Sequence, residues 1–233
     1  MNLHVGTSGY SYKEWKGSFY PEKLPAKDML RFYSERLSTV EINATFYRMP
    51  QKSILENWKE QVPGSFRFSL KAPQRVTHFK RLKDTAEDTK YFFETASVLE
   101  GQLGVVLFQL PPNMKKDLPR LEAFVNNLPQ QPPAAFEFRH PTWFDDDVLE
   151  LLRSRNRALV VSDTDDMPTT HIDKTADWGY LRLRRVNYSE ENLAEWHQRI
   201  RAQEWKQTFV FFKHEDEGTG PKLAAQFLKL ASK

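Results

Sequence analysis

The residues best suited to chemistry in this chain are carboxylates, amides and bases at alternate positions of short apolar runs. In residues 40–48, Glu41, Asn43 and Thr45 alternate with apolar neighbours. Such alternation is typical of a strand with one polar face. Glu137 occupies a similar position in a later run. We expect Glu41 and Glu137 to act as general acid and base, with burial raising the pKa of one and arginine lowering that of the other.

Basic side chains occur at the same alternate positions of other runs. They are Arg67, Lys71, Arg139, Arg182, Arg184 and Lys213, and they outnumber the acids Glu41, Glu137 and Asp163. If all of them face one interior, positive charge is left over, and the guanidinium group matches phosphate and carboxylate geometry. The pattern therefore predicts an anion site. The alternative is an internal salt-bridge network or bonds to loop carbonyls, and we favour a structural role for Arg67, which lies early in its run.

Other polar and aromatic side chains complete the candidate site. Asn43, Gln109 and Tyr180 are expected to orient substrate hydroxyls, and His78 and His140 could transfer protons near neutral pH, although a lone histidine is more often structural. The residues expected to be catalytic are Glu41, Glu137 and His140. Those expected to bind the substrate or its anionic group are Ser8, Tyr10, Asn43, Tyr47, Arg48, Lys71, His78, Gln109, Arg139, Trp143, Asp163 and Arg182.

Two other functions fit the same residues. The first is metal-dependent cleavage of nucleic acid, with ligands drawn from Glu41, His78, Glu137, His140, Asp163 and His214. No H-E-x-x-H or comparable spacing supports it, so we expect no metal or other cofactor and keep a divalent metal as the alternative. Nucleic acid could also bind without metal, through arginines on phosphates and aromatic rings on bases. The second is a non-catalytic binding module with the same pocket.

The elements that must position these residues are eight strand-like runs separated by helical patterns. The runs are residues 3–8, 39–45, 66–72, 103–110, 134–140, 158–163, 178–184 and 208–214. Helical spacing covers residues 29–37, 54–61, 85–99, 118–128, 148–155, 193–202 and 221–230. This alternation predicts a closed (β/α)8 TIM barrel, formed as one compact domain by residues 1–233. The acidic segment 164–177 contains Pro168, so the sixth strand should be followed by little or no helix.

Entry signals precede several of the predicted helices. Asp28 precedes the first, Ser53 and Glu56 have capping-box spacing at the second, and Thr85 with Asp88 gives a weaker version. In a barrel, alternate residues of each strand face the lumen. Apolar positions assign Val40, Ile42 and Ala44 to the helix side and leave an unusually polar lumen. Because barrel active sites lie at the carboxyl ends of the strands, the site is expected there.

Composition limits the function classes. The chain has 233 residues and a net charge of +3, from 34 basic and 31 acidic residues, which is too balanced to indicate a nucleic-acid protein. It has no cysteine, so disulfides, thiolate catalysis and cysteine-bound metals are excluded. The first residues lack a signal-peptide pattern and no run is long enough to span a membrane, so we expect a cytoplasmic protein without membrane partners. The sequence does not indicate an oligomeric state.

Several motifs resemble those of the YecE-like family of TIM-barrel proteins, also called domain of unknown function 72. They are Gly6-Thr7-Ser8-Gly9-Tyr10-Ser11-Tyr12, Val40-Glu41-Ile42-Asn43, Thr45-Phe46-Tyr47-Arg48, Thr77-His78, Gln109-Leu110-Pro111-Pro112, Arg139-His140 and Tyr180-Leu181-Arg182. The resemblance implies a (β/α)8 barrel with a cleft at the strand ends. Similarity of such barrels to the endonuclease IV and sugar-isomerase kinds implies a nucleic-acid or phosphosugar ligand. The chain departs from the family pattern at Arg184-Arg185 and Lys213-His214.

Overall fold

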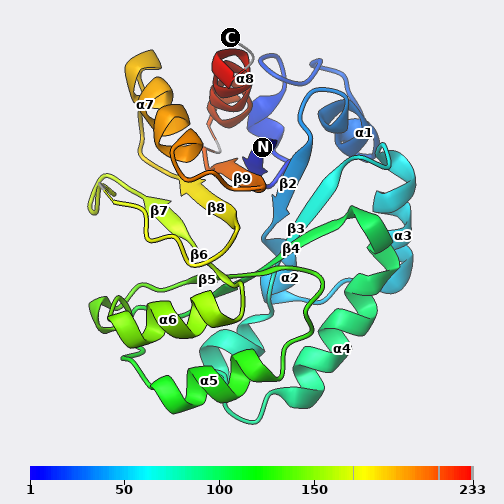
Figure 1. Cartoon of the computed structure of the whole chain (residues 1–233). Coiled ribbons are helices and arrows are strands. Elements are labelled where there is room, and N and C mark those ends of the chain that lie inside the picture. The colour runs from blue at the N-terminus through cyan, green and yellow to red at the C-terminus, as the bar shows by residue number, and fades with distance from the viewer. Residues whose placement is uncertain (170, 215, 232–233) are drawn as a thin grey trace.

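Nine parallel strands form a nearly closed barrel with helices around its outside (Figure 1). The structure is a computed structural model that describes residues 1–169, 171–214 and 216–231. The strands are β1 (Asn2–Ser8), β2 (Thr39–Ile42), β3 (Arg67–Lys71), β4 (Leu103–Gln109), β5 (Ala134–Glu137), β6 (Ala158–Leu159), β7 (Val161–Asp163), β8 (Trp178–Leu183) and β9 (Gln207–Phe212). Their order is β6-β5-β4-β3-β2-β1-β9-β8-β7. The predicted TIM-barrel fold is confirmed.

β6 and β7 are two parts of the predicted sixth strand, residues 158–163. β6 pairs with β5, whereas β7 pairs with β8. The interruption falls at Val160, whose N–H donates to the Phe136 carbonyl at 2.9 Å. The strand therefore changes its neighbour within six residues and joins the two ends of the sheet.

The outer layer consists of helices that follow the strands. They are α1 (Met29–Ser34), α2 (Ala44–Tyr47), α3 (Lys52–Gln61), α4 (Ala86–Ala96), α5 (Leu118–Asn126), α6 (Asp146–Ser154), α7 (Glu190–Arg201) and α8 (Thr219–Ala231). Short helical turns are η1 (Lys13–Trp15), η2 (Ala26–Asp28), η3 (Arg75–Phe79), η4 (Ser97–Gln102) and η5 (Pro141–Trp143). Between β7 and β8 the described residues 164–169 and 171–177 contain no helix, as predicted. No helix in the described part of the chain is long and apolar enough to cross a membrane.

Two strands end three residues earlier than predicted. β2 stops at Ile42, because Asn43 has helical backbone angles and α2 begins at Ala44. Thr45 Oγ1 fixes this turn by donating to the carbonyl oxygens of Ile42 and Lys71, at 3.1 and 2.7 Å. Ala44, expected to face the outer helices, is exposed instead. β5 likewise stops at Glu137, so the residues after it belong to a loop.

The expected helix starts are right in position at Asp28 and Thr85, which are the N-cap residues of α1 and α4, and wrong at Ser53. α3 begins at Lys52, and neither Ser53 nor the other two expected caps, Asp28 and Thr85, makes a capping hydrogen bond. The charge of Asp88 pairs with Arg75 and Lys80. Asp88 therefore has its partners outside its own helix, which local spacing does not reveal. A capping box forms at α7, between Ser189 and Asn192.

The core has two parts, divided by the barrel wall. Outward side chains such as Phe108, Phe136 and Phe212 pack against the helices. Inward side chains form a separate apolar cluster that fills the amino-terminal and middle levels of the lumen: Val105, Leu107, Ala135, Ala158, Val160, Ala176, Trp178, Tyr180, Phe209 and Phe211. The lumen is therefore largely apolar at these levels, and its buried ion pairs lie toward the carboxyl ends of the strands. Arg67 bonds the Gly64 and Phe66 carbonyls, in agreement with its predicted structural role.

Candidate functional site

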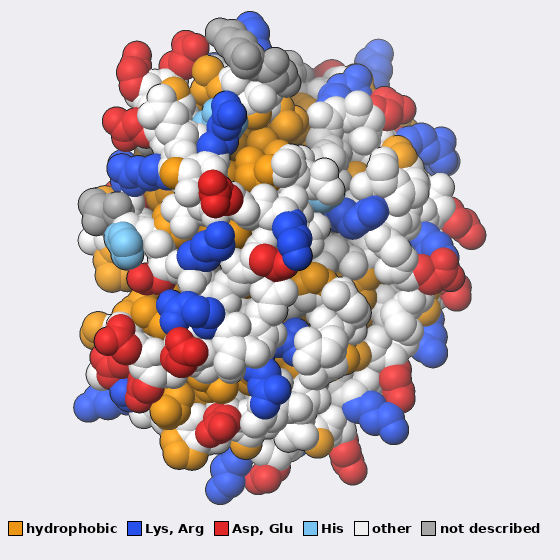
Figure 2. Space-filling view, in the orientation of Figure 1, with side chains coloured by type: hydrophobic (Ala, Val, Ile, Leu, Met, Phe, Trp, Pro, Cys, Tyr) orange, Lys and Arg blue, Asp and Glu red, His pale blue; other side chains and the backbone are white. Residues whose placement is uncertain are grey.

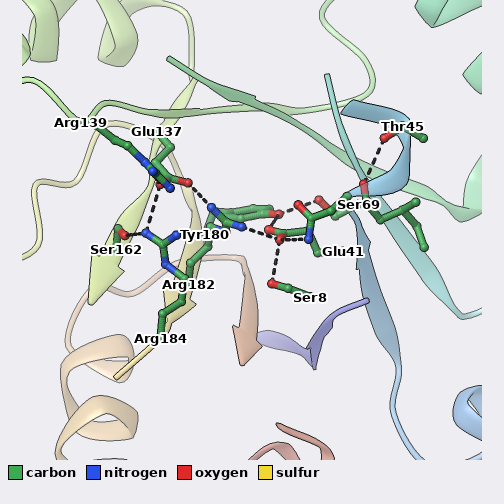
Figure 3. A network of polar contacts seen from close by, with 12 residues as sticks. Ser8, Glu41, Thr45, Ser69, Glu137, Arg139, Ser162, Tyr180, Arg182 and Arg184 are labelled. Carbon is green, nitrogen blue, oxygen red and sulfur yellow. Dashed lines mark hydrogen bonds and ion pairs between the residues drawn. The ribbon is translucent and has the colours of Figure 1, made fainter. Parts of the chain in front are cut away.

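Arg182 joins two buried carboxylates above the apolar part of the lumen (Figure 3). Its Nη2 lies 2.9 Å from Glu41 Oε1, and its Nη1 donates to Glu137 Oε2 at 2.5 Å. None of the three side chains is more than 3% exposed. β2, β5 and β8 are thus linked across the barrel by one guanidinium group, because each side chain points inward near the end of its strand.

Hydrogen bonds from Ser8, Tyr180 and Asn43 saturate Glu41. Ser8 Oγ of β1 donates to Oε1 and the Tyr180 hydroxyl of β8 donates to Oε2, both at 2.7 Å. Asn43 Nδ2 lies 3.3 Å from Oε1. The Tyr180 hydroxyl also lies 2.7 Å from Ser69 Oγ on β3, and since it donates to Glu41 it accepts from Ser69. Glu41 therefore organises the lumen and has little capacity left for a ligand.

Glu137 is surrounded by guanidinium groups. Its Oε1 lies 3.2 Å from Arg139 Nε and 3.3 Å from Arg184 Nη2, and Oε2 is occupied by Arg182. Arg184 Nη2 also donates to Ser162 Oγ. Figure 3 shows Arg139 and Arg184 gathered on one side of Glu137, away from Glu41. The two arginines share a single carboxylate oxygen, so their positive charge is only partly compensated.

Both buried acids are ionised. Burial alone would raise the pKa of Glu137, but Arg182, Arg184 and Arg139 outweigh it and lower that pKa to about 2. Burial is likewise outweighed at Glu41, where Arg182 and the Tyr180 and Ser8 hydroxyls lower the pKa. The expectation that burial would raise the pKa of one acid is wrong. Neither residue holds a proton at neutral pH, so neither can act as the general acid.

Two other groups at this end of the barrel have lowered pKa values, Lys71 and His78. Burial, followed by the charge of Arg182, lowers the pKa of Lys71 to about 8. Burial and the nearby cations Lys71 and Arg139 also lower the pKa of His78. Both side chains contact Phe46: the Lys71 Nζ lies 4.1 Å from the ring centre, and the His78 ring meets it edge-on at 4.8 Å.

A cleft of about 1660 Å³ opens at the carboxyl ends of β5 to β9. Its polar lining includes Glu137, Arg139, Ser162, Arg184 and Lys213. Apolar side chains Phe144, Met167 and Val186 also line it, and they are 48%, 65% and 69% exposed. Acidic residues lie along the same cleft: Asp165, Asp166, Asp173, Asp216 and Glu217. The cleft is thus basic near the lumen and acidic in its loops.

Eight of the expected site residues gather at the mouth of the barrel. They are Ser8, Glu41, Asn43, Lys71, Gln109, Glu137, Arg139 and Arg182. Gln109 ends β4 beside Glu137 and is nearly buried. Inward alternation along the strands identified these positions. Arg184 lies two positions after Arg182 and faces the same side, so the same alternation could have placed it among the anion-binding residues. Nothing in the sequence marks the apolar residues of the cleft.

Two expected site residues, Asp163 and Trp143, are engaged elsewhere. Asp163 is wholly buried, 2.8 Å from Arg185 Nε and 2.9 Å from the Tyr188 hydroxyl, and so fixes the loop after β8. Trp143 is wholly buried, stacks on outward-facing Phe138 at 4.8 Å and donates to the Met114 carbonyl at 2.7 Å. It therefore does not line the cleft.

Tyr10 packs toward the outer core, 6.3 Å from the Tyr33 ring, and burial raises its pKa to about 12. His140 caps η5, with its Nδ1 accepting from the Thr142 N–H. Tyr47 and Arg48 are exposed in the segment around α2. These positions depend on loop conformation, so a contribution from them to binding stays a prediction.

The expected metal ligands do not converge. No group of three or more His, Asp or Glu side chains in the described ranges is arranged to hold a metal ion. Glu41 and Glu137 bind Arg182, and Asp163 binds Arg185. The metal-dependent alternative therefore gains no support from this geometry.

The fold and the site define a TIM-barrel-like α/β protein with a polar site at the carboxyl ends of its strands. The chain belongs to the DUF72 family, described as "Protein of unknown function DUF72", whose model matches residues 4–233. The predicted family is thereby confirmed. The family description assigns no activity.

Relatives span much of the chain. UPF0759 protein YunF of Bacillus subtilis is 25% identical over 98% of this chain and 94% of its own length. UPF0759 protein YecE of Escherichia coli is 31% identical, over 61% of this chain and 50% of its own length. A DUF72 family protein from Thermotoga maritima has a similar crystal structure, with a TM-score of 0.86, 29% identity and full coverage of both chains. One from Enterococcus faecalis, 19% identical with a TM-score of 0.81, covers 99% of this chain and 96% of its own and shares the fold.

Proposed function

We propose that this protein binds a small phosphorylated or otherwise anionic molecule in the cleft, with Arg139 and Arg184 as the anion-binding groups. The observation that carries the proposal is the shared use of one carboxylate oxygen by these two guanidinium groups. Arg182 already occupies the other oxygen. A second anion beside Arg139 and Arg184 would complete their coordination, and planar guanidinium groups suit phosphate and carboxylate oxygens.

Exposure favours Arg139 as the first contact. Its side chain is 35% exposed, compared with 15% for Arg184 and 3% for Arg182. Arg184 Nε is buried and has no hydrogen-bond partner. Arg139 can therefore contact a ligand while it stays bonded to Glu137. The less exposed Arg184 adds positive charge next to it.

The remaining charges of the cleft favour a small ligand over a nucleic acid. Asp165, Asp166, Asp173, Asp216 and Glu217 line the same space and would repel a polyanion that passed over them. On the face shown in Figure 2, acidic and basic side chains are interspersed without a broad positive area. A compact ligand needs favourable contact only at its anionic group, and Phe144, Met167 and Val186 offer apolar surface for the rest of it.

The experiment is a calorimetric titration of the protein with inorganic phosphate and with a panel of sugar phosphates. Arg139→Gln should weaken binding at least about tenfold, because it removes a charge-assisted contact. The control is Arg153→Gln on α6, which removes an equally charged residue paired with Glu150. Equal affinity of the wild type and Arg139→Gln would contradict the proposal. Steeply salt-dependent binding of an oligonucleotide would favour the nucleic-acid alternative instead.

A further inference from the structure

Lys71 is the lysine at the mouth of the barrel whose ammonium lacks a charge partner. It ends β3, where Thr45 Oγ1 donates to its backbone carbonyl at 2.7 Å and fixes the main chain. The side chain is only partly exposed and its Nζ lies 4.1 Å from the Phe46 ring centre. Within the described ranges, Nζ forms no ion pair or hydrogen bond. An ammonium held partly out of water without a carboxylate partner is unfavourable.

The surrounding charges disfavour the ammonium form. Arg182 and Arg139 repel it, while Glu41 and Glu137, which attract it, are already bound to guanidinium groups. Together with burial they lower the pKa of Lys71 to about 8. About half of Lys71 is then the free amine at pH 8, whereas an ordinary lysine is less than about 1% neutral there. A desolvated amine next to cations is the arrangement that makes a lysine nucleophilic.

We propose that Lys71 is a nucleophile that forms an imine with an aldehyde or ketone whose anionic group binds Arg139 and Arg184. The inference rests on the proposed function, because the anion site would position the carbonyl carbon. The amine lone pair attacks that carbon and the carbonyl π electrons move to oxygen, which takes up a proton. The resulting carbinolamine loses its oxygen as water after a second proton transfer, and the nitrogen keeps the positive charge of a protonated imine. The overall step consumes one proton from solvent and needs no oxidant or reductant.

The positive imine would lie among groups suited to the next steps. The ionised carboxylates Glu41 and Glu137 interact electrostatically with the Lys71 nitrogen and favour its cationic form. His78, whose pKa is lowered, shares the Phe46 ring with Lys71 and could accept a proton from the carbon beside the imine. The substrate class is therefore a phosphorylated or carboxylated carbonyl compound. A simple packing role of Lys71 over Phe46 predicts none of this reactivity.

The test is reductive trapping of the wild-type protein with glycolaldehyde phosphate and sodium cyanoborohydride, followed by peptide mass spectrometry. The hydride reduces any imine to a stable secondary amine, so each reacting lysine is recorded. Lys71 should react at least tenfold faster than Lys90, which is 76% exposed on α4, and its rate should rise with a midpoint near pH 8. Glycolaldehyde without the phosphate should label Lys71 at least tenfold more slowly than glycolaldehyde phosphate.

Two other results separate the inference from the proposed function. Lys71 could react faster than Lys90 by the same factor with both aldehydes. That result would support Lys71 as a nucleophile and overturn the anion site at Arg139 and Arg184. If inorganic phosphate binds in an Arg139-dependent way but Lys71 reacts no faster than Lys90, the anion site stands and the imine proposal is overturned. Lys71→Arg, which keeps the charge, should lose the fast-labelled peptide while still binding phosphate.

Discussion

The guanidinium of Arg182 lies 2.9 Å from the carboxylate of Glu41, and the two side chains are 3% and 0% exposed. A buried ion pair of this kind contributes little net stability over a well-packed apolar pair. Removing one of its members is strongly destabilising, because the other charge is left buried without a partner. Glu137 makes the same contact at the other end of Arg182, so two acids depend on one base. The site residues are therefore held as one unit, which preorganises the arginines next to the cleft.

Removing Arg182 should destabilise the protein strongly. Arg182→Met leaves two buried carboxylates without their shared partner, and we expect a loss of about 3–5 kcal/mol in the free energy of unfolding. Urea denaturation followed by circular dichroism measures it. The triple variant Arg182→Met, Glu41→Gln, Glu137→Gln should recover much of the loss. If the single variant is as stable as the wild type, the ion-pair account is wrong.

Acid should weaken the fold through Glu137. Its folded-state pKa, about 2, lies below the ordinary value of 4.5, so its stabilising effect is full above pH 4.5. The effect is lost as pH falls from 4.5 toward 2, because the unfolded state binds the proton first. Unfolding free energies at pH 5, 4 and 3 should fall more steeply for the wild type than for Glu137→Gln. Parallel profiles would rule out a dominant role for this residue.

Lys71 should cost the protein stability at neutral pH. Its pKa falls on folding from 10.5 to about 8, so the charged amine is disfavoured in the folded state below pH 8 and the cost disappears as pH rises to 10.5. We expect Lys71→Met to increase the free energy of unfolding by about 1–3 kcal/mol at pH 7. The gain should shrink at pH 10. A variant less stable than the wild type at pH 7 would indicate that Lys71 is a structural residue.

Trp143 should affect stability without affecting ligand binding. Trp143→Phe keeps the ring stacked on Phe138 but removes the Nε1 donor to the Met114 carbonyl, which is expected to cost about 1–3 kcal/mol. Thermal denaturation checks the stability, and phosphate calorimetry checks the affinity. A tenfold change in phosphate affinity would restore Trp143 to the binding site.

Strand alternation predicted the part of the site that lies on strands. Glu41, Glu137 and Arg182 were assigned to the lumen because their neighbours along each strand are apolar. In a closed barrel, inward-facing side chains of different strands lie close together. The same rule failed two residues beyond the end of β2. Ala44 was assigned to the outer side, but the chain had already turned into α2, where Thr45 bonds the Lys71 carbonyl.

Loop contacts explain most of the remaining differences. Asp163 is held by Arg185 and Tyr188, more than twenty positions away, and Trp143 by the carbonyl of Met114. Such contacts join segments whose relative placement depends on the whole fold, so spacing within one segment does not reveal them. The expected rise in the pKa of one acid failed for a similar reason, whereas the expected lowering by arginine is found at both acids. The two pKa values depend on which arginine reaches which carboxylate, and only the three-dimensional arrangement shows that Arg182 reaches both.

The change of neighbour at Val160 gives the barrel a seam. The β5–β6 ladder has two residue pairs and the β7–β8 ladder has three, whereas β1 and β9 share six. The seam borders the cleft, since Leu159, Val160 and Val161 all line it. Fewer backbone hydrogen bonds must break there for the wall to separate, so amides near Val160 should exchange with deuterium faster than those of β1. Local opening of the barrel wall beside the cleft should therefore be least costly at this seam, and the Arg182 network would not have to break for it.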